Sequence, residues 1–283
     1  MFGTLYIVAT PIGNLEDITL RALRMLKEVD LIAAEDTRRT KILLNHYGIA
    51  TAVTSYHEHN EKAKARALIA RLKQGVSIAL VSDAGTPTLS DPGYRLLQGA
   101  VQEGIPVVPL PGPSALTAVL SASALATDRF VFEGFLPPKK RERRERLQSL
   151  QEETRTLVFF EVPHRLKESL ADLLEILGDR EVTMGREVTK VHEEFLRGRL
   201  SEVNAEAHRR ELRGELTFVV KGLDRTRETA PSEAVLIAEI QSLRKKGMRV
   251  KEIAELLGEK FSYPKREIYQ LILDVETETR STL

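Results

Sequence analysis

The chain has 283 residues, 42% of them hydrophobic and 29% charged, with a formal net charge of +1. This length and composition are typical of a folded protein with more than one domain and exclude a disordered chain. The small net charge excludes a generally polycationic protein that coats nucleic acid. The absence of cysteine excludes disulfides and thiolate-bound metal clusters. No apolar run reaches the roughly 20 residues of a membrane span, and the first residues lack the basic start of a signal peptide, so we expect a cytoplasmic protein without membrane contact.

The first 130 residues alternate short apolar runs with amphipathic stretches. The apolar runs predict strands over 5–9, 31–34, 53–56, 77–81 and 107–110. The amphipathic stretches predict helices over 20–29, 39–47, 61–74, 94–103 and 114–125. Such alternation predicts an α/β domain with a mainly parallel sheet, in which ligands bind at the carboxyl ends of the strands.

The pattern changes near residue 130, and two further regions follow. An apolar segment at 130–138 predicts a strand that runs into a linker. Beyond it we predict strands over 156–160, 181–187 and 216–220 and a helix over 165–177. Three helical patterns at the end of the chain span 232–246, 250–257 and 264–277, and the last two favour a helix-turn-helix-like arrangement. We therefore predict domains at 1–128 and 129–224 and a small helical module at 225–283.

Three turns rich in glycine and proline follow predicted strands of the first domain. They lie at 10–14, 82–93 and 109–114. Glycine permits positive φ and close backbone approach, and proline stiffens a loop. One such turn is an ordinary connection, but three at one sheet edge predict a single ligand pocket. Neither the glycine pattern of dinucleotide-binding folds nor that of P-loops occurs, so the pocket is not predicted to be a common phosphate site.

Several long segments of the chain carry a resemblance to a known family: 8–19, 34–38, 81–93 and 111–115, with further matches at 132–137, 159–165 and 185–190. They resemble the tetrapyrrole methylase superfamily, and within it the cytidine 2′-O-methyltransferases of small-subunit ribosomal RNA. The resemblance implies two α/β domains, the first with a mainly parallel sheet and the second with a mixed sheet, that enclose S-adenosylmethionine in the cleft between them. It also implies a homodimer.

The same resemblance assigns cofactor-binding residues motif by motif. Two of these residues belong to the first turn. The second turn faces the methionine part of the cofactor, and the second domain forms a wall around the adenosine. These residues are Pro11, Gly13, Asp83, Ala84, Gly85, Thr86, Leu89, Ser90, Ser114, Ala115, Phe160, Glu161, Leu216 and Thr217.

Methyl transfer to a ribose hydroxyl needs a group that receives the hydroxyl proton. Glu35 and Asp36 end the second predicted strand and are candidates, although Asp36 is equally typical of a helix N-cap with a nearby ion pair. Glu187 and Lys190 follow another strand and can act as base or phosphate contact, or can belong to a solvated β-hairpin. No cluster has metal-ligand spacing, so we expect no metal.

Basic residues in several places are candidates for RNA contact. They are Arg38, Lys139, Lys140, Arg141, His164, Arg165, Lys245, Lys246, Arg249, Lys265 and Arg266. The charge run at 139–146 is also typical of a solvated helix face, and Arg165 of an ordinary surface position. The partner implied is small-subunit ribosomal RNA within the assembled small subunit.

Two other functions are compatible with these residues. One is a methylase of the same fold that acts on a tetrapyrrole or a protein side chain. The other is a non-catalytic RNA-binding assembly factor that keeps the nucleoside pocket. The basic third region and the segment 34–38 weigh against the first alternative, and the three intact turns weigh against the second.

Overall fold

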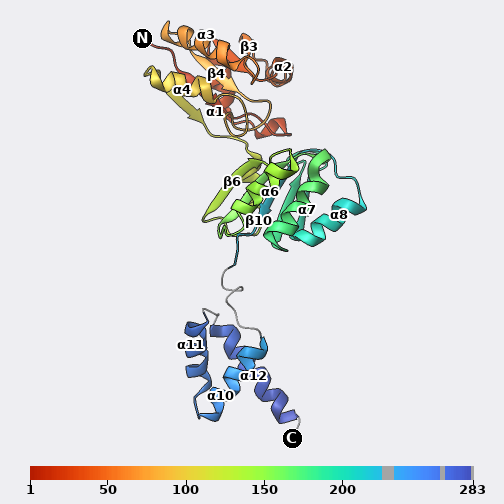
Figure 1. The fold of residues 1–283 in the computed structure, drawn as a ribbon. Helices are drawn as coiled ribbons and strands as arrows, with labels where there is room; N and C mark the ends of the chain where they lie inside the picture. Colours follow the sequence, from red (N-terminus) through yellow and green to blue (C-terminus); the bar gives the residue numbers. More distant parts are fainter. Residues whose placement is uncertain (225–232, 262–264, 282–283) are drawn as a thin grey trace. The chain divides into compact units, whose positions relative to one another are not determined.

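The computed structural model describes residues 1–224, 233–261 and 265–281, which form two compact units at 1–222 and 223–283 (Figure 1). Both predicted α/β domains fall within the first unit, so their boundary near residue 128 stays a prediction. The start of the predicted module at 225 and the predicted helix starts at 232 and 264 lie outside the described residues.

The first sheet of the first unit is entirely parallel. Its strands are β1 (Leu5–Val8), β2 (Leu31–Ala34), β3 (Val53–Ser55), β4 (Ile78–Val81) and β5 (Val107–Leu110). They lie in the order β3-β2-β4-β1-β5. The predicted parallel α/β sheet is therefore confirmed, and all its loops to the next helix leave from one edge.

Helices cover both faces of this sheet, which explains why its inner strands β2 and β4 are apolar and buried along their whole length. These helices are α1 (Leu20–Glu28), α2 (Thr37–His46), α3 (Glu61–Lys73) and α4 (Tyr94–Gln102). Leu5 and Ile7 of β1 share a core with residues of α3 and α4, whereas Val8 shares one with residues of α1 and α2. Helix α2 begins two residues before the predicted start, because Asp36 caps it by accepting a hydrogen bond from the Arg38 N–H.

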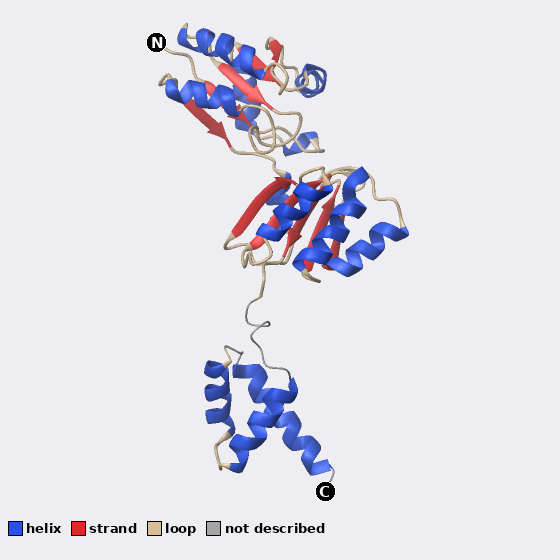
Figure 2. Ribbon diagram, in the orientation of Figure 1, coloured by secondary structure: helices blue, strands red, loops and turns tan. Residues whose placement is uncertain are grey.

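The second sheet is mixed, as predicted (Figure 2). Its strands are β6 (Phe130–Phe135), β7 (Thr156–Glu161), β8 (Glu181–Arg186), β9 (Glu194–Arg199) and β10 (Leu216–Val220). The order is β6-β7-β10-β8-β9, with β6 and β7 parallel and the other pairs antiparallel. Strand β9 and the helix α8 (Leu200–Arg209) were not predicted. Strand β9 carries arginines and a glycine and owes its conformation to pairing with β8.

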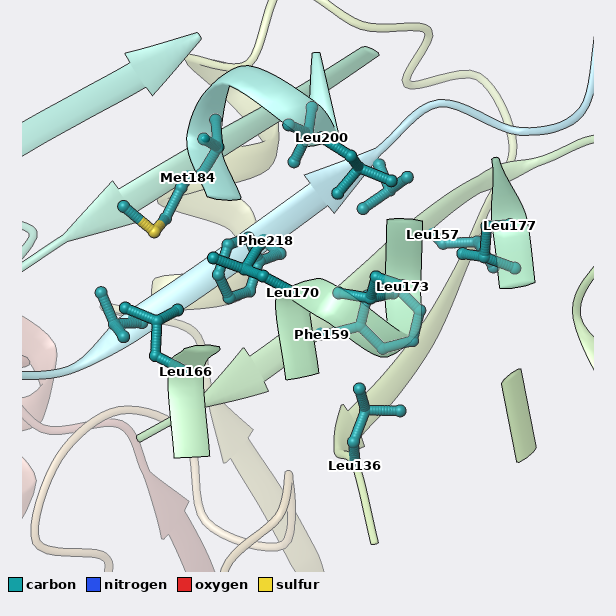
Figure 3. Close-up of a cluster of buried hydrophobic side chains, with 14 of the residues drawn as sticks. Leu136, Leu157, Phe159, Leu166, Leu170, Leu173, Leu177, Met184, Leu200 and Phe218 are labelled. Carbon is teal, nitrogen blue, oxygen red and sulfur yellow. The ribbon is translucent and has the colours of Figure 1, made fainter. Parts of the chain in front are cut away.

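Each face of the second sheet has its own helical cover. Helices α6 (Lys140–Ser149), α7 (Leu166–Leu177) and α8 enclose the largest core, in which Leu170 and Leu173 pack with Phe159 and Phe218 (Figure 3). The opposite face is covered by α5 (Ala115–Ser121), which ends four residues before the predicted end. Because α5 follows β5 of the first sheet directly, the chain ties the two sheets together through this helix.

In its described residues the second unit holds helices at the three places where the sequence predicts them. Its helices are α10 (Glu233–Lys245), α11 (Val250–Lys260) and α12 (Lys265–Ser281). They enclose a small core of buried residues, listed here: Ile240, Ile253, Ala254, Leu257, Ile268 and Ile272. Across the parts of the chain that the structure describes, we find no helix with the length and apolar character to traverse a bilayer.

The basic run at 139–146 is not a uniform solvated surface, because one of its arginines is buried. The Arg143 side chain is 1% exposed and donates through Nε to Asp172 Oδ2 at 2.7 Å. Arg144 donates to the other Asp172 oxygen at 2.8 Å, and Arg143 also pairs with Glu168. These ion pairs join α6 to α7. Removal of one partner would leave an uncompensated charge in the core.

We therefore expect Asp172→Ala to lower the free energy of unfolding of the full chain by about 3–5 kcal/mol, since it leaves the buried guanidinium of Arg143 with only the exposed carboxylate of Glu168 as an ionic partner. Urea unfolding measures the difference. The matched control is Arg141→Ala, whose side chain is 88% exposed and pairs with Glu145 on the helix surface; we expect about 0–1 kcal/mol there. Equal effects of the two substitutions would contradict the buried ion pair.

Candidate functional site

A cavity of about 270 Å³ lies in the first unit, bounded by loops of the first sheet and strand ends of the second. Its lining includes most of the predicted cofactor residues: Ala84, Gly85, Thr86, Leu89, Ser90, Ser114, Ala115, Phe160, Glu161, Leu216 and Thr217. The structure therefore brings the second and third glycine- and proline-rich turns to one place, together with Ile12 of the first.

Backbone hydrogen bonds fasten these turns to one another. The Thr10 N–H donates to the Gly85 carbonyl and the Gly85 N–H donates to the Thr10 carbonyl, both at 2.9 Å. The Thr10 hydroxyl also donates to the Ser82 carbonyl at 3.0 Å. The Thr86 hydroxyl donates to the Pro113 carbonyl at 3.4 Å, which reaches the third turn.

The second turn holds an unusual backbone conformation. Gly85 has φ +80°, and a Cβ at this position would meet only atoms at 3.5 Å or beyond, so the dihedral angle rather than space requires glycine here. Thr88 and Ser90 have φ values of 76° and 66°, a conformation that side chains disfavour. The Ser90 side chain packs closely against Gly134 at the bulge of β6. A Cβ added to Gly134 would lie 2.8 Å from the Ser90 hydroxyl.

One wall of the cavity is aromatic. Phe135 and Phe160 both line it, with ring centroids 5.6 Å apart and planes at 62°. Phe132 supports Phe160 from behind at 5.0 Å. Phe135 is 48% exposed, although it is a large apolar residue. An exposed ring beside an apolar cavity suits a flat ligand such as a nucleobase.

Three predicted cofactor residues do not line this cavity. Pro11 and Asp83 line a neighbouring cavity of about 130 Å³. Gly13 lies under the loop between β8 and β9, where an added Cβ would sit 2.3 Å from Lys190 Cγ and 2.9 Å from the Thr189 hydroxyl. Gly13 therefore allows the first turn to pack closely against that loop.

Glu161 lines the cavity, but both oxygens of its carboxylate are bound by other groups of the protein. Its side chain is 1% exposed and pairs with Arg165 at 2.8 Å. It also accepts hydrogen bonds from the Ser169 hydroxyl at 2.5 Å and from the Val162 N–H at 2.9 Å. Arg165, a predicted RNA contact, is mostly buried and is bound to Glu161 and to the Leu136 carbonyl; it does not line the cavity.

Glu35 and Asp36 link the second strand to the turn after β4. The Asp36 N–H donates to Asp83 Oδ1 at 2.9 Å, and the Asp83 N–H donates to Glu35 Oε2 at 3.2 Å. Burial raises the pKa of Glu35, whereas hydrogen bonds from Arg38 lower the pKa of Asp36 to about 2. Asp36 is therefore the helix cap with an ion pair that the sequence left open, and neither residue is among those that line the two cavities described.

Glu187 and Lys190 form an ion pair at 2.9 Å in the connection between β8 and β9, and Lys190 also reaches Glu215 at 3.2 Å. Despite partial burial, hydrogen bonds and charge from Lys190 hold the pKa of Glu187 below its ordinary value. Likewise the two glutamates raise the pKa of Lys190 against the effect of burial. A cationic lysine and a stabilised carboxylate are both poor proton acceptors.

The predicted RNA contacts are mostly on the surface. Arg38, Lys139, Lys140, Arg141 and His164 are exposed in the first unit, and Lys245, Lys246, Arg249, Lys265 and Arg266 are exposed in the second. In the first unit, three of these cations face acidic partners: Arg38 pairs with Asp36, Lys139 with Glu142 and Arg141 with Glu145.

The sequence analysis missed several residues of the cavity: Ile12, Asp91, Leu116, Phe135, Val162 and Glu215. Asp91 is the most informative of them. Burial raises the pKa of Asp91 to about 6, and the negative charges of Glu35, Asp83 and Glu215 add to this effect. Asp91 lies inside the second glycine- and proline-rich turn, directly after Ser90, so its place in this turn could have identified it as a candidate site residue. Among the described residues no cluster of three or more potential metal ligands occurs.

Comparisons with known proteins agree with this geometry. The family model of the Tetrapyrrole (Corrin/Porphyrin) Methylases matches residues 4–204. A protein of Halalkalibacterium halodurans named ribosomal RNA small subunit methyltransferase I is 48% identical over 272 residues, which cover 95% of this chain and 94% of that protein. The protein of the same name from Thermotoga maritima is 52% identical over 220 residues, covering 78% of this chain and 99% of its own length.

Solved structures share the fold. Uroporphyrin-III C-methyl transferase from Thermus thermophilus, complexed with S-adenyl homocysteine, has a TM-score of 0.55 and 21% sequence identity. The match covers 77% of this chain and 97% of that one.

The raised pKa of Asp91 predicts a measurable pH dependence of stability. Between its unfolded value of 3.8 and its folded value of about 6, the unfolded chain releases the proton before the folded chain does. Stability contributed by Asp91 therefore falls as the pH rises through this window. We expect Asp91→Asn to escape this loss, so that its free energy of unfolding exceeds that of wild type increasingly from the lower to the upper value.

Urea unfolding from about pH 2 to about pH 6 covers both windows and measures the difference. Asp36→Asn is the control with the opposite sign, because the pKa of Asp36 is lowered to about 2. The stabilising contribution of Asp36 is present above its unfolded value of 3.8 and is lost as the pH falls toward 2, below the window of Asp91. A difference between wild type and Asp91→Asn that does not change with pH would contradict the electrostatics of the cavity.

Proposed function

The chain belongs to the tetrapyrrole methylase family, and from this premise we propose that it is an S-adenosylmethionine-dependent enzyme that methylates the ribose 2′-hydroxyl of a cytidine in small-subunit ribosomal RNA. The observation that carries the proposal is near full-length similarity to proteins named ribosomal RNA small subunit methyltransferase I, together with a cavity built from the turns that characterise the family. We further propose that it works in the cytoplasm, as a homodimer, on the assembled small subunit.

The cavity offers what a nucleoside-containing methyl donor requires. Backbone groups of Ala84 and Gly85 border it, and so do the start of α5 at Ser114 and Ala115. Phe135 and Phe160 provide an aromatic wall for a base, and stacking of a base on such a ring contributes about 1–3 kcal/mol. When bound, S-adenosylmethionine supplies an activated methyl group on a sulfonium.

The chain's own contribution is to hold donor and acceptor in line. Correct placement of two reacting atoms lowers the barrier by up to about 7–11 kcal/mol, provided that the site is rigid. The mutual hydrogen bonds of Thr10 and Gly85, the contact of Ser90 with Gly134 and the packing of Lys190 over Gly13 supply that rigidity. We propose that the small cavity at Pro11 and Asp83 lies on the side from which the RNA approaches.

The reaction is tested with purified protein, labelled S-adenosylmethionine and small ribosomal subunits that lack the modification. We expect label on the 2′-oxygen of one cytidine, identified by nuclease digestion and mass spectrometry. Naked ribosomal RNA serves as the control for the proposed preference for assembled subunits. Label on a base, on protein or on a tetrapyrrole, or no transfer at all, would refute the proposal and favour one of the alternatives.

We propose that the second unit adds affinity for RNA without taking part in the chemistry. The Thermotoga maritima relative is matched over 99% of its own length yet covers only 78% of this chain, so about a fifth of this chain has no counterpart there. The family model ends at residue 204, within the first unit. Exposed cations of the second unit include the predicted RNA contacts Lys245, Lys246, Arg249, Lys265 and Arg266.

Deletion of residues 223–283 is expected to weaken binding of the small subunit and to reduce its salt dependence, because each lost phosphate contact lowers the salt slope by about 0.7–0.9. The methyl-transfer rate at saturating subunit concentration should stay the same. A matched variant that keeps the unit but replaces these five cations by glutamine should show the same loss. Unchanged affinity and salt dependence after the deletion would show that the unit does not bind RNA.

A further inference from the structure

Three carboxylic side chains belong to residues that line the large cavity, and they are in different states. Glu161 is ion-paired with Arg165 and hydrogen-bonded on both oxygens. Glu215 is 66% exposed and pairs with Lys190. Asp91 is partly buried and forms no ion pair with any residue that the structure describes. Asp91 is therefore the carboxyl group of this cavity that is not held by a cation.

The backbone fixes Asp91 firmly. Ser90 before it has φ 66° and rests on Gly134 of β6. Pro92 after it restricts Asp91 to extended conformations. Gly93 has φ 138°, and a Cβ there would lie 2.8 Å from Leu80 Cδ2, so the end of the turn is packed against β4. A loop with this much unfavourable backbone conformation is typical of a functional site.

We propose that Asp91 is the catalytic base that accepts the proton of the ribose hydroxyl during methyl transfer. This inference rests on the proposed function, because it assigns a residue to that reaction. Its support is the position of Asp91 in the wall of the cavity, the lack of a cationic partner and the rigid turn that presents it.

The step balances as a displacement. The hydroxyl oxygen forms a bond to the methyl carbon, and the bond from that carbon to sulfur breaks with its electron pair left on sulfur. The sulfonium becomes a neutral thioether, S-adenosylhomocysteine. The O–H bond breaks, its electron pair remains on the ribose oxygen, and the proton passes to the Asp91 carboxylate and then to water.

The acid–base properties of Asp91 suit this role. A general base works best when its pKa lies near the working pH, because it is then both ionised and basic. Burial raises the pKa of Asp91 to about 6 against the opposing effect of the Ser82 hydroxyl, and the charges of Glu35, Asp83 and Glu215 add to the rise. Arg39 pairs with Asp83 at 3.6 Å and Lys190 with Glu215, so the cations nearby are bound to the neighbours of Asp91.

The four bases considered from the sequence fit less well. Asp36 caps a helix and has a pKa of about 2, and Glu187 is stabilised as a carboxylate by Lys190. Lys190 itself is held in its protonated form. Glu35 has a raised pKa but accepts the Asp83 N–H and does not belong to the lining of the large cavity.

The test compares full-length wild type with Asp91→Asn, Asp91→Glu, Glu35→Gln and the surface control Asp128→Asn, whose side chain is 77% exposed. Calorimetry gives the Kd for S-adenosylmethionine, and single-turnover transfer to unmodified small subunits gives the rate on both sides of the Asp91 pKa. We expect Asp91→Asn to lower the rate about 10²–10⁴-fold with an unchanged Kd. It should also abolish the acid limb that we expect for wild type near pH 6, and Asp91→Glu should restore part of the rate.

The outcomes separate the two proposals. If wild type methylates the ribose and Asp91→Asn matches the surface control or keeps the acid limb, this inference is wrong and the proposed function stands. If Asp91→Asn loses cofactor affinity but transfers normally at saturation, Asp91 holds the cofactor and is not the base. A loss confined to Glu35→Gln would assign the base to Glu35. Wild type that methylates no ribose refutes the proposed function and this inference with it.

Discussion

The site depends on one backbone interaction, the mutual pair of hydrogen bonds between Thr10 and Gly85. It joins the turn after β1 to the turn after β4 beyond the carboxyl edge of the sheet. Gly85 can make both bonds because it adopts φ +80°, a conformation that is costly for residues with a side chain. The rest of the second turn, including Leu89, Ser90 and Asp91, is positioned relative to this pair and then meets the second sheet at Gly134.

The sequence predicted the parallel sheet well because local signals agree with the tertiary structure there. Strands β2 and β4 are buried along their whole length and are apolar throughout, so pattern and environment coincide. Strand β9 was missed because its residues Glu194, Arg197 and Arg199 form ion pairs and surface contacts, and only pairing with β8 makes the segment a strand. Long-range pairing of this kind leaves little trace in local composition.

The site was predictable to the level of motifs but not of individual contacts. The turns that line the cavity stand out as glycine- and proline-rich strings, yet nothing local shows that Gly13 serves packing against Lys190 or that Glu161 is consumed by Arg165 and Ser169. Asp91 lies in one of these strings, but its raised pKa could not be predicted from it. That pKa depends on burial and on the charges of Asp83 in the same turn and of Glu35 and Glu215, which are distant in sequence.

The buried charged groups of the first unit differ in whether they have a partner of opposite charge. Arg143 with Asp172 and Arg165 with Glu161 are buried pairs that satisfy each other, so their side chains are held in place and unavailable to ligands. The carboxyl of Asp91 is instead left among like charges, which costs stability but keeps it basic. Several exposed cations of the first unit are also paired with acids, which makes them less available to other anions. The net charge of +1 is a count over the whole chain, so it is compatible with a local basic surface for the polyanionic substrate proposed above.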